Sequence, residues 1–144
     1  MRYFPSLLSE QQTLEFLERI EAFFEQSNYG LYAAELKATG EFIGYAGFAK
    51  PAFNSFFTPC VEIGWRLAKE YWGMGYATEA GKGCLLYGFK KLGFDRIVSF
   101  TSLLNVKSES VMKRIGMTRI GEFDHPSLPS SSPLFRHVLY ESLA

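Results

Sequence analysis

The feature that most constrains the fold is a strand, a glycine-rich turn and a helix in direct succession at residues 61–92. Apolar residues alternate along 60–67, as in a strand with one buried face. Gly73 and Gly75 follow, and a helix then runs to about Leu92 and ends at Gly93. Glycine lets the backbone approach a ligand closely, and a helix N-terminus carries free N–H groups and a positive dipole end. The unit therefore predicts a site that suits a phosphate or pyrophosphate.

The spacing of this turn excludes two known phosphate-binding motifs. It is not a P-loop, because no Gly-Lys-Ser/Thr follows the glycines. It is not a dinucleotide-binding turn, because Ala77 and Thr78 stand where a third glycine is expected and the preceding strands have an antiparallel pattern. On spacing alone, phosphate binding and plain turn chemistry remain equal alternatives.

The rest of the chain predicts an α/β (α+β) fold. Ser9 and Gln12 form a capping box, which opens an amphipathic helix of about 9–26 whose apolar stripe is expected in the core. Asn105 is a good N-cap for a helix of about 106–115. Strands are expected at 31–36, 41–48, 60–67, 97–101, 117–123 and 135–142. This order predicts one domain, 1–144, with a mixed sheet and helices on its faces.

Composition narrows the class of partner. The 144 residues carry 15 basic and 15 acidic side chains, and this balance argues against binding to nucleic acid. No apolar run approaches the ~20 residues of a membrane span and no signal peptide opens the chain, so we expect a cytoplasmic protein that does not bind membranes. Cys60 and Cys84 are expected to be reduced, and two histidines without further ligand spacing predict no metal site.

The turn and its surroundings resemble a known family. The runs 62–67 and 71–80 are similar to the GNAT superfamily of acetyl-CoA-dependent N-acetyltransferases, and most of all to its Rim-type branch, which acetylates ribosomal-protein N-termini. The likeness continues through 105–108, 112–117, 123–126 and 137–140, in the family's order. It implies a GNAT-like, mostly antiparallel mixed sheet and acetyl-CoA as cosubstrate.

The resemblance also implies which residues bind the cosubstrate. The family's pyrophosphate motif, Gln/Arg-x-x-Gly-x-Gly/Ala, falls on 72–77, with Trp72 in place of the Gln or Arg. Backbone N–H groups of this turn would hold the pyrophosphate, and the strand end at 65–67 would pair with pantetheine. The implied set is Trp65, Leu67, Trp72, Gly73, Met74, Gly75, Tyr76, Ala77, Asn105 and Ser108. Trp65 and Leu67 have ordinary core packing as an alternative.

Two residues are implied to carry the chemistry. Many members protonate the departing thiolate with a tyrosine, but Met112 stands at that position, so the resemblance implies Ser108, one helical turn after the asparagine. The alternative for Ser108 is a bond within its own helical turn. Glu62 is the implied general base, acting directly or through a water. Its alternative is an ion pair with Arg66, and His125 or a water chain could then be the base.

The start of the chain differs from the family pattern. Relatives carry a strand and a helix before the segment equivalent to 1–5, so we expect a domain that lacks its first strand and helix. The strand at 31–36 would then be an unpaired edge, through which the chain forms a homodimer or which another segment covers.

The function expected from the sequence is acetyl transfer to a primary amine, either a protein N-terminus or a small-molecule amine, by direct attack. The alternative is a non-catalytic acyl-CoA-binding module with an incomplete acceptor site.

Overall fold

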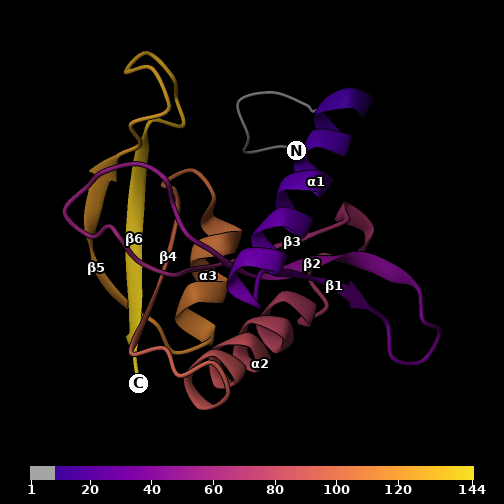
Figure 1. Cartoon of the computed structure of the whole chain (residues 1–144). Coiled ribbons are helices and arrows are strands. Elements are labelled where there is room, and N and C mark those ends of the chain that lie inside the picture. Colours follow the sequence, from indigo (N-terminus) through magenta and orange to yellow (C-terminus); the bar gives the residue numbers. More distant parts are fainter. Residues whose placement is uncertain (1–8) are drawn as a thin grey trace.

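A computed structural model describes residues 9–144. The α-helices are α1 (Glu10–Ser27), α2 (Tyr76–Lys90) and α3 (Val106–Arg114), and a short 3-10 helix, η1 (Lys69–Tyr71), follows the third strand. The strands are β1 (Leu31–Glu35), β2 (Phe42–Ala49), β3 (Glu62–Leu67), β4 (Arg96–Ser102), β5 (Thr118–Asp124) and β6 (Arg136–Leu143). They form one sheet in the order β1-β2-β3-β4-β6-β5 (Figure 1).

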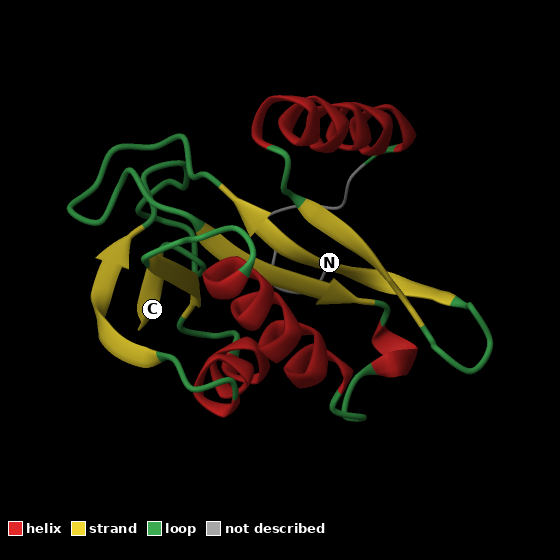
Figure 2. Cartoon of the chain, turned by 60° about the horizontal axis from the view of Figure 1, so that its bottom comes forward, coloured by secondary structure: helices red, strands yellow, loops and turns green. Residues whose placement is uncertain are grey.

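The predicted fold class is confirmed. All neighbouring strands are antiparallel except β3 and β4, so the sheet is mixed and mostly antiparallel. Helix α1 lies on one face of the sheet, and α2 and α3 lie side by side on the other (Figure 2). The predicted strands and helices all occur, with ends shifted by one or two residues. The 3-10 helix η1 was not predicted.

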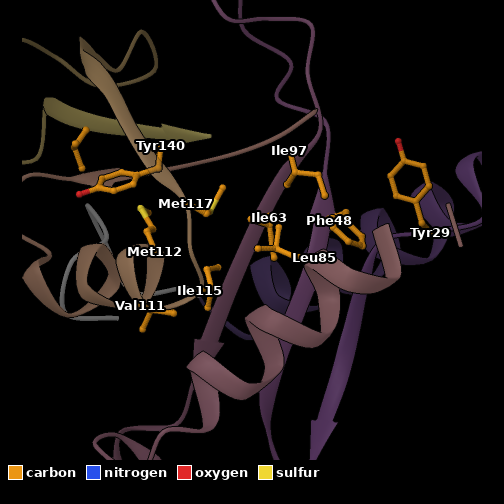
Figure 3. Packing of buried hydrophobic residues seen from close by; sticks show 11 residues of the cluster. Tyr29, Phe48, Ile63, Leu85, Ile97, Val111, Met112, Ile115, Met117 and Tyr140 are labelled. Atoms are coloured by element: carbon orange, nitrogen blue, oxygen red, sulfur yellow. The ribbon is translucent and has the colours of Figure 1, made fainter. Parts of the chain in front are cut away.

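Two apolar clusters hold the layers together. The larger cluster lies between the sheet and α2, where Phe48, Ile63 and Ile97 pack around Leu85 (Figure 3). Gly88 allows this close approach, because a Cβ there would lie 2.9 Å from Ile97 Cδ1. The second cluster lies on the opposite face of β4, because successive side chains of a strand alternate between faces. Its members are Phe57, Val98, Phe123 and Leu139, with Phe53, Cys60 and Phe100 packed against them.

Helix α1 begins as predicted but is less buried than predicted. The Ser9 hydroxyl accepts from the Gln12 backbone N–H at 3.1 Å, and the Gln12 side chain accepts from the Ser9 N–H at 2.8 Å. Leu14 and Leu17, however, are 51% and 49% exposed. The helix contacts its neighbours through a narrower line of aromatic rings, with Phe16 against Tyr45, and the two leucines lie off that line. No helix within residues 9–144 is long and apolar enough to cross a membrane.

Among the strands of residues 9–144, β1 is one edge of the sheet, as predicted for residues 31–36. The Phe48 N–H donates to the Gly30 carbonyl at 3.0 Å, so alternation points the backbone groups of Leu31, Ala33 and Glu35 away from β2. The segment 1–5, before which relatives were expected to carry a strand and a helix, lies outside the described residues.

Candidate active site

The candidate site lies where the parallel strands β3 and β4 separate. They pair at one position, Glu62 with Val98, where the Val98 N–H donates to the Val61 carbonyl at 2.9 Å. On its other side β3 pairs with β2 along its whole length. Beyond Glu62 no further backbone pair joins β3 and β4 within the described residues, and the unpaired stretch between their C-terminal halves is here called the gap.

The backbone of β3 faces this gap at Trp65. Because the Val61 carbonyl bonds to β4, alternation directs the backbone groups of every second residue, including Trp65 and Leu67, to the same side. The Leu67 carbonyl is taken by the Trp72 indole N–H at 2.9 Å. Among the pairings of residues 9–144, β4 provides none for the N–H and C=O of Trp65.

The side chains of the same strand are part of the core. Leu67 is buried, and Trp65 packs against the larger cluster near Gly81 of α2. This geometry favours ordinary core packing over cofactor contact for the side chains of Trp65 and Leu67. A ligand in the gap would meet the backbone of β3.

The helices α2 and α3 both begin at the open end of the gap, because each follows one of two parallel strands. Between β3 and α2, Gly73 and Gly75 have φ values of 78° and 82°. A Cβ at either glycine would meet no atom within 4 Å, so the turn is open on its outer side. Gly75 is the N-cap of α2 and no side chain caps this helix. The open turn and its uncapped N–H groups fit an anionic ligand.

The start of α3 contributes Asn105 and Ser108. The Asn105 Oδ1 accepts from the Ser108 backbone N–H at 3.3 Å, so the predicted cap is confirmed. The Ser108 hydroxyl is half-buried and has no hydrogen bond to the protein within residues 9–144. Met112 lies in the core and is 1% exposed, consistent with its having no part in the chemistry.

Lys107 is a candidate site residue that the sequence analysis did not identify. Its Nζ lies 4.6 Å from the centroid of the Trp72 ring, which places an ammonium group beside the glycine turn. None of the ion pairs in the described part of the chain involves this lysine. The signal in the sequence was the replacement of the family's Gln or Arg by Trp72, which leaves the turn without a polar side chain at that position.

Glu62 lies at the point where the strands part, on the face opposite Ile63. The residue is half-buried, and loss of solvent around its carboxylate raises its pKa to about 8. The ion pairs of residues 9–144 do not include Glu62. Arg66, its alternative partner, interacts instead with Tyr45 and opposes the rise that burial causes in the Tyr45 pKa. Two residues along β3 on the same face, a Cβ at Gly64 would meet nothing within 4 Å.

The two histidines lie together in the second apolar cluster. Their ring centroids are 4.9 Å apart, and Phe53, Phe100 and Phe123 contact one or both rings. The His125 Nδ1 accepts from the Ser127 N–H at 3.1 Å, so a neutral His125 carries its proton on Nε2. Burial lowers the pKa of His125, and burial together with His125 lowers the pKa of His137 to about 4. Both rings are therefore neutral at pH 7.

Comparisons with known proteins agree on one family. Residues 1–118 match the family model described as an acetyltransferase (GNAT) domain. The uncharacterized protein YkkB of Bacillus subtilis is 34% identical over 119 residues, which cover 81% of this chain and 67% of that protein. The FsC-acetyl coenzyme A-N(2)-transacetylase of Aspergillus fumigatus is 33% identical over 90 residues, which cover 60% of this chain and 38% of that protein.

Solved structures share the fold. A GNAT-family acetyltransferase from Bacillus anthracis superimposes with a TM-score of 0.77 at 28% identity, covering 99% of this chain and 80% of its own. The ribosomal-protein acetyltransferase RimL, solved in complex with coenzyme A, has a TM-score of 0.74 at 17% identity. The match covers 94% of this chain and 73% of RimL. This chain thus spans part of the length of each protein compared. The matched domain and the shared fold establish that the chain belongs to the GNAT family of N-acetyltransferases.

Proposed function

We propose that the chain binds acetyl-CoA across the gap between β3 and β4 and transfers the acetyl group to a primary amine. The observation that carries the proposal is the placement of this gap. It opens between two helix N-termini, and Glu62 lies at its apex. A single opening thus offers donors for phosphate at one end and a titratable carboxylate at the other.

The proposed binding mode uses backbone more than side chains. The N–H groups of Met74, Tyr76 and Ala77, with the two glycines of the turn, bind the pyrophosphate, and Lys107 supplies a cation beside it. Trp72 acts indirectly, because its indole N–H holds the turn against the end of β3. The N–H and C=O of Trp65 pair with the amides of the pantetheine arm. RimL, which shares the fold, binds coenzyme A, and this supports the assignment.

The proposed chemistry is a direct attack on the thioester. Glu62, or a water that it orients, accepts a proton from the ammonium form of the acceptor. The amine nitrogen then bonds to the carbonyl carbon, and the carbon–sulfur bond breaks with its electron pair on sulfur, so that coenzyme A leaves as a thiolate. The nitrogen loses its second proton as the tetrahedral intermediate collapses, and this proton passes to the departing sulfur or to water. The Ser108 hydroxyl donates a hydrogen bond or proton to that sulfur. Asn105 caps α3 and so fixes Ser108 in place.

The pKa of Glu62 favours one kind of acceptor. A carboxylate with a pKa of about 8 matches a terminal α-amine, whose pKa is about 7.7–8.0. Deprotonating a lysine amine, with a pKa near 10.4, is uphill for the same base by roughly two pKa units. Within the proposed function, peptide N-termini and other amines of low pKa are therefore the preferred acceptors.

The second candidate function is an acyl-CoA-binding module without turnover. Both candidate functions use the glycine turn and the gap to bind the cosubstrate, and they differ only in whether an acceptor amine is bound for reaction. Calorimetric titration with acetyl-CoA tests what both candidates share: saturation near one equivalent is expected, and a titration without heat of binding would exclude both. Release of free thiol on adding an amine then separates an enzyme from a binder.

We predict that Ser108→Ala lowers kcat by about a hundredfold, the lower end of the range for a positioned proton donor, and leaves the KM for acetyl-CoA nearly unchanged. The hydroxyl acts on the departing sulfur, whereas the backbone N–H that caps α3 is retained. Steady-state kinetics measure both constants. The matched variant Ser110→Ala, on the same helix, should leave kcat unchanged, and a Ser108→Ala enzyme with parental kcat would remove Ser108 from the mechanism.

We also propose that the chain pairs with a second copy through β1. Strand β1 is an open edge within residues 9–144, and its exposed Ala33 points backbone groups outward. A symmetric pair would satisfy these groups without rearranging the sheet.

We predict that Ala33→Pro converts this dimer to a monomer. Proline removes one outward N–H, and the bonds to β2, which come from the alternate residues, remain. Size-exclusion chromatography with light scattering gives the mass of each form. The control Lys37→Pro, in the turn after β1, should stay dimeric, because no hydrogen bond is found for the Lys37 N–H within residues 9–144. A parent that is monomeric at high concentration would exclude the pairing.

A further inference from the structure

The parting of β3 and β4 coincides with one buried side-chain hydrogen bond. Ser99 of β4 is 2% exposed, and its Oγ donates to the Ile63 carbonyl of β3 at 2.9 Å. The backbone of Ser99 pairs with Tyr140 on β6, so only its side chain reaches β3. The bond lies one residue beyond the single backbone pair of the two strands, Glu62 with Val98.

The carbonyl that Ser99 occupies is the next acceptor of a continued ladder. In a regular parallel pair, the bond after Val98-to-Val61 runs from the Phe100 N–H to the Ile63 carbonyl. Here the Ser99 hydroxyl donates to this oxygen, and the register between β3 and β4 stops at Glu62 and Val98. Continued pairing would next use the N–H of Trp65, the residue whose backbone faces the gap.

We infer that Ser99 is a positioning residue that ends the pairing of β3 with β4 and so sets where the opening for acetyl-CoA begins. The inference rests on the proposed function for the ligand, but not for the strand geometry. Its hydroxyl satisfies the Ile63 carbonyl, so this buried oxygen does not need the Phe100 N–H. The backbone of Trp65 is thereby kept available for the amides of pantetheine.

Ser99→Ala tests the inference, because it leaves the Ile63 carbonyl without its donor. The Phe100 N–H is then expected to donate to the Ile63 carbonyl, which closes the end of the gap nearest Glu62. In the free protein, amide hydrogen exchange at Phe100 should slow about tenfold or more, and the Kd for acetyl-CoA should rise about tenfold, the effect of one or two hydrogen bonds. Ser99→Thr, which keeps the hydroxyl, should restore both values.

Two further variants keep the test decisive. Ser102→Ala removes another buried hydroxyl of β4. This hydroxyl accepts from the Leu104 N–H and has no hydrogen bond to β3 within residues 9–144, so Phe100 exchange should not change. If Ser99→Ala does not fold, Ser99→Val is compared with Ser99→Thr, because the two side chains have the same shape and only threonine has the hydroxyl.

The outcomes separate this inference from the proposed function. A parent that does not bind acetyl-CoA contradicts the proposed function, and Phe100 exchange still reports on the strands. A parent that binds, with a Ser99→Ala variant that binds equally well and leaves Phe100 exchange at the parental rate, overturns the role of Ser99.

Discussion

Gly75→Val is expected to raise the Kd for acetyl-CoA on the order of a hundredfold, through steric blocking and local backbone strain. Gly75 has a φ of 82°, which β-branched residues rarely adopt, and it precedes the first residue of α2. The valine side chain would also project into the open space outside the turn, where the proposed pyrophosphate lies. Isothermal calorimetry gives the Kd directly.

The control for this variant is Gly93→Val. Gly93 has a φ of 73° and, like Gly75, would place a Cβ where no atom lies within 4 Å. The two variants therefore carry a similar backbone strain, but Gly93 follows the other end of α2. Gly93→Val should lose stability and keep parental binding. Equal binding by Gly75→Val and the parent would show that the turn does not hold the cosubstrate.

Glu62→Gln is expected to lower kcat/KM by about 10² to 10⁴, the usual contribution of a positioned general base. The parent should gain activity as pH rises through about 8, where Glu62 becomes a carboxylate. The variant lacks this titration, so its profile follows the ionisation of the amine alone, and raising the pH recovers part of the loss. The pH–rate profiles of both enzymes are measured with the same amine, so that they differ only in the ionisation of residue 62. The control Glu35→Gln removes an exposed carboxylate on β1 and should behave as the parent does.

The same substitution, Glu62→Gln, lowers activity but should reduce the loss of folding stability that occurs as pH rises. The Glu62 pKa is raised by folding, from 4.5 to about 8, so the folded chain keeps a proton that the unfolded chain releases. This group thus favours the folded state at low pH, and that contribution is lost as pH rises from about 4.5 through about 8. Urea unfolding at pH 5 and pH 9 should show a smaller decline for Glu62→Gln than for the parent. A variant with parental activity and the parental stability profile would leave His125 or a water chain as the base.

Local sequence patterns predicted the elements because each is specified by neighbours along the chain. The capping box at Ser9 and Gln12, the alternation of β3 and the cap at Asn105 all act within one or two turns of backbone. The tight turn before α2 was also predictable, because Gly73 and Gly75 readily adopt the positive φ values that it requires.

Features that depend on pairing between distant segments were not predictable in this way. The single-residue register of β3 with β4 depends on Ser99, which looks like any polar residue in a short strand. The contact of Lys107 with Trp72 joins residues on two elements, and the Glu62 pKa reflects the packing around β3. The exposure of Leu14 and Leu17 depends on how α1 rests on the sheet, because periodicity gives a stripe but not how much of it is covered.

The most direct test of the account is thiol release from acetyl-CoA by the whole chain, measured with a panel of primary amines. The panel holds peptides with different first residues, lysine blocked at its α-amine, and small diamines. We expect free thiol to appear with an amine, in equal amount to the acetylated product, and faster for α-amines than for the blocked lysine. Tight binding of acetyl-CoA with no thiol released by any amine would contradict transfer and leave the chain a binding module.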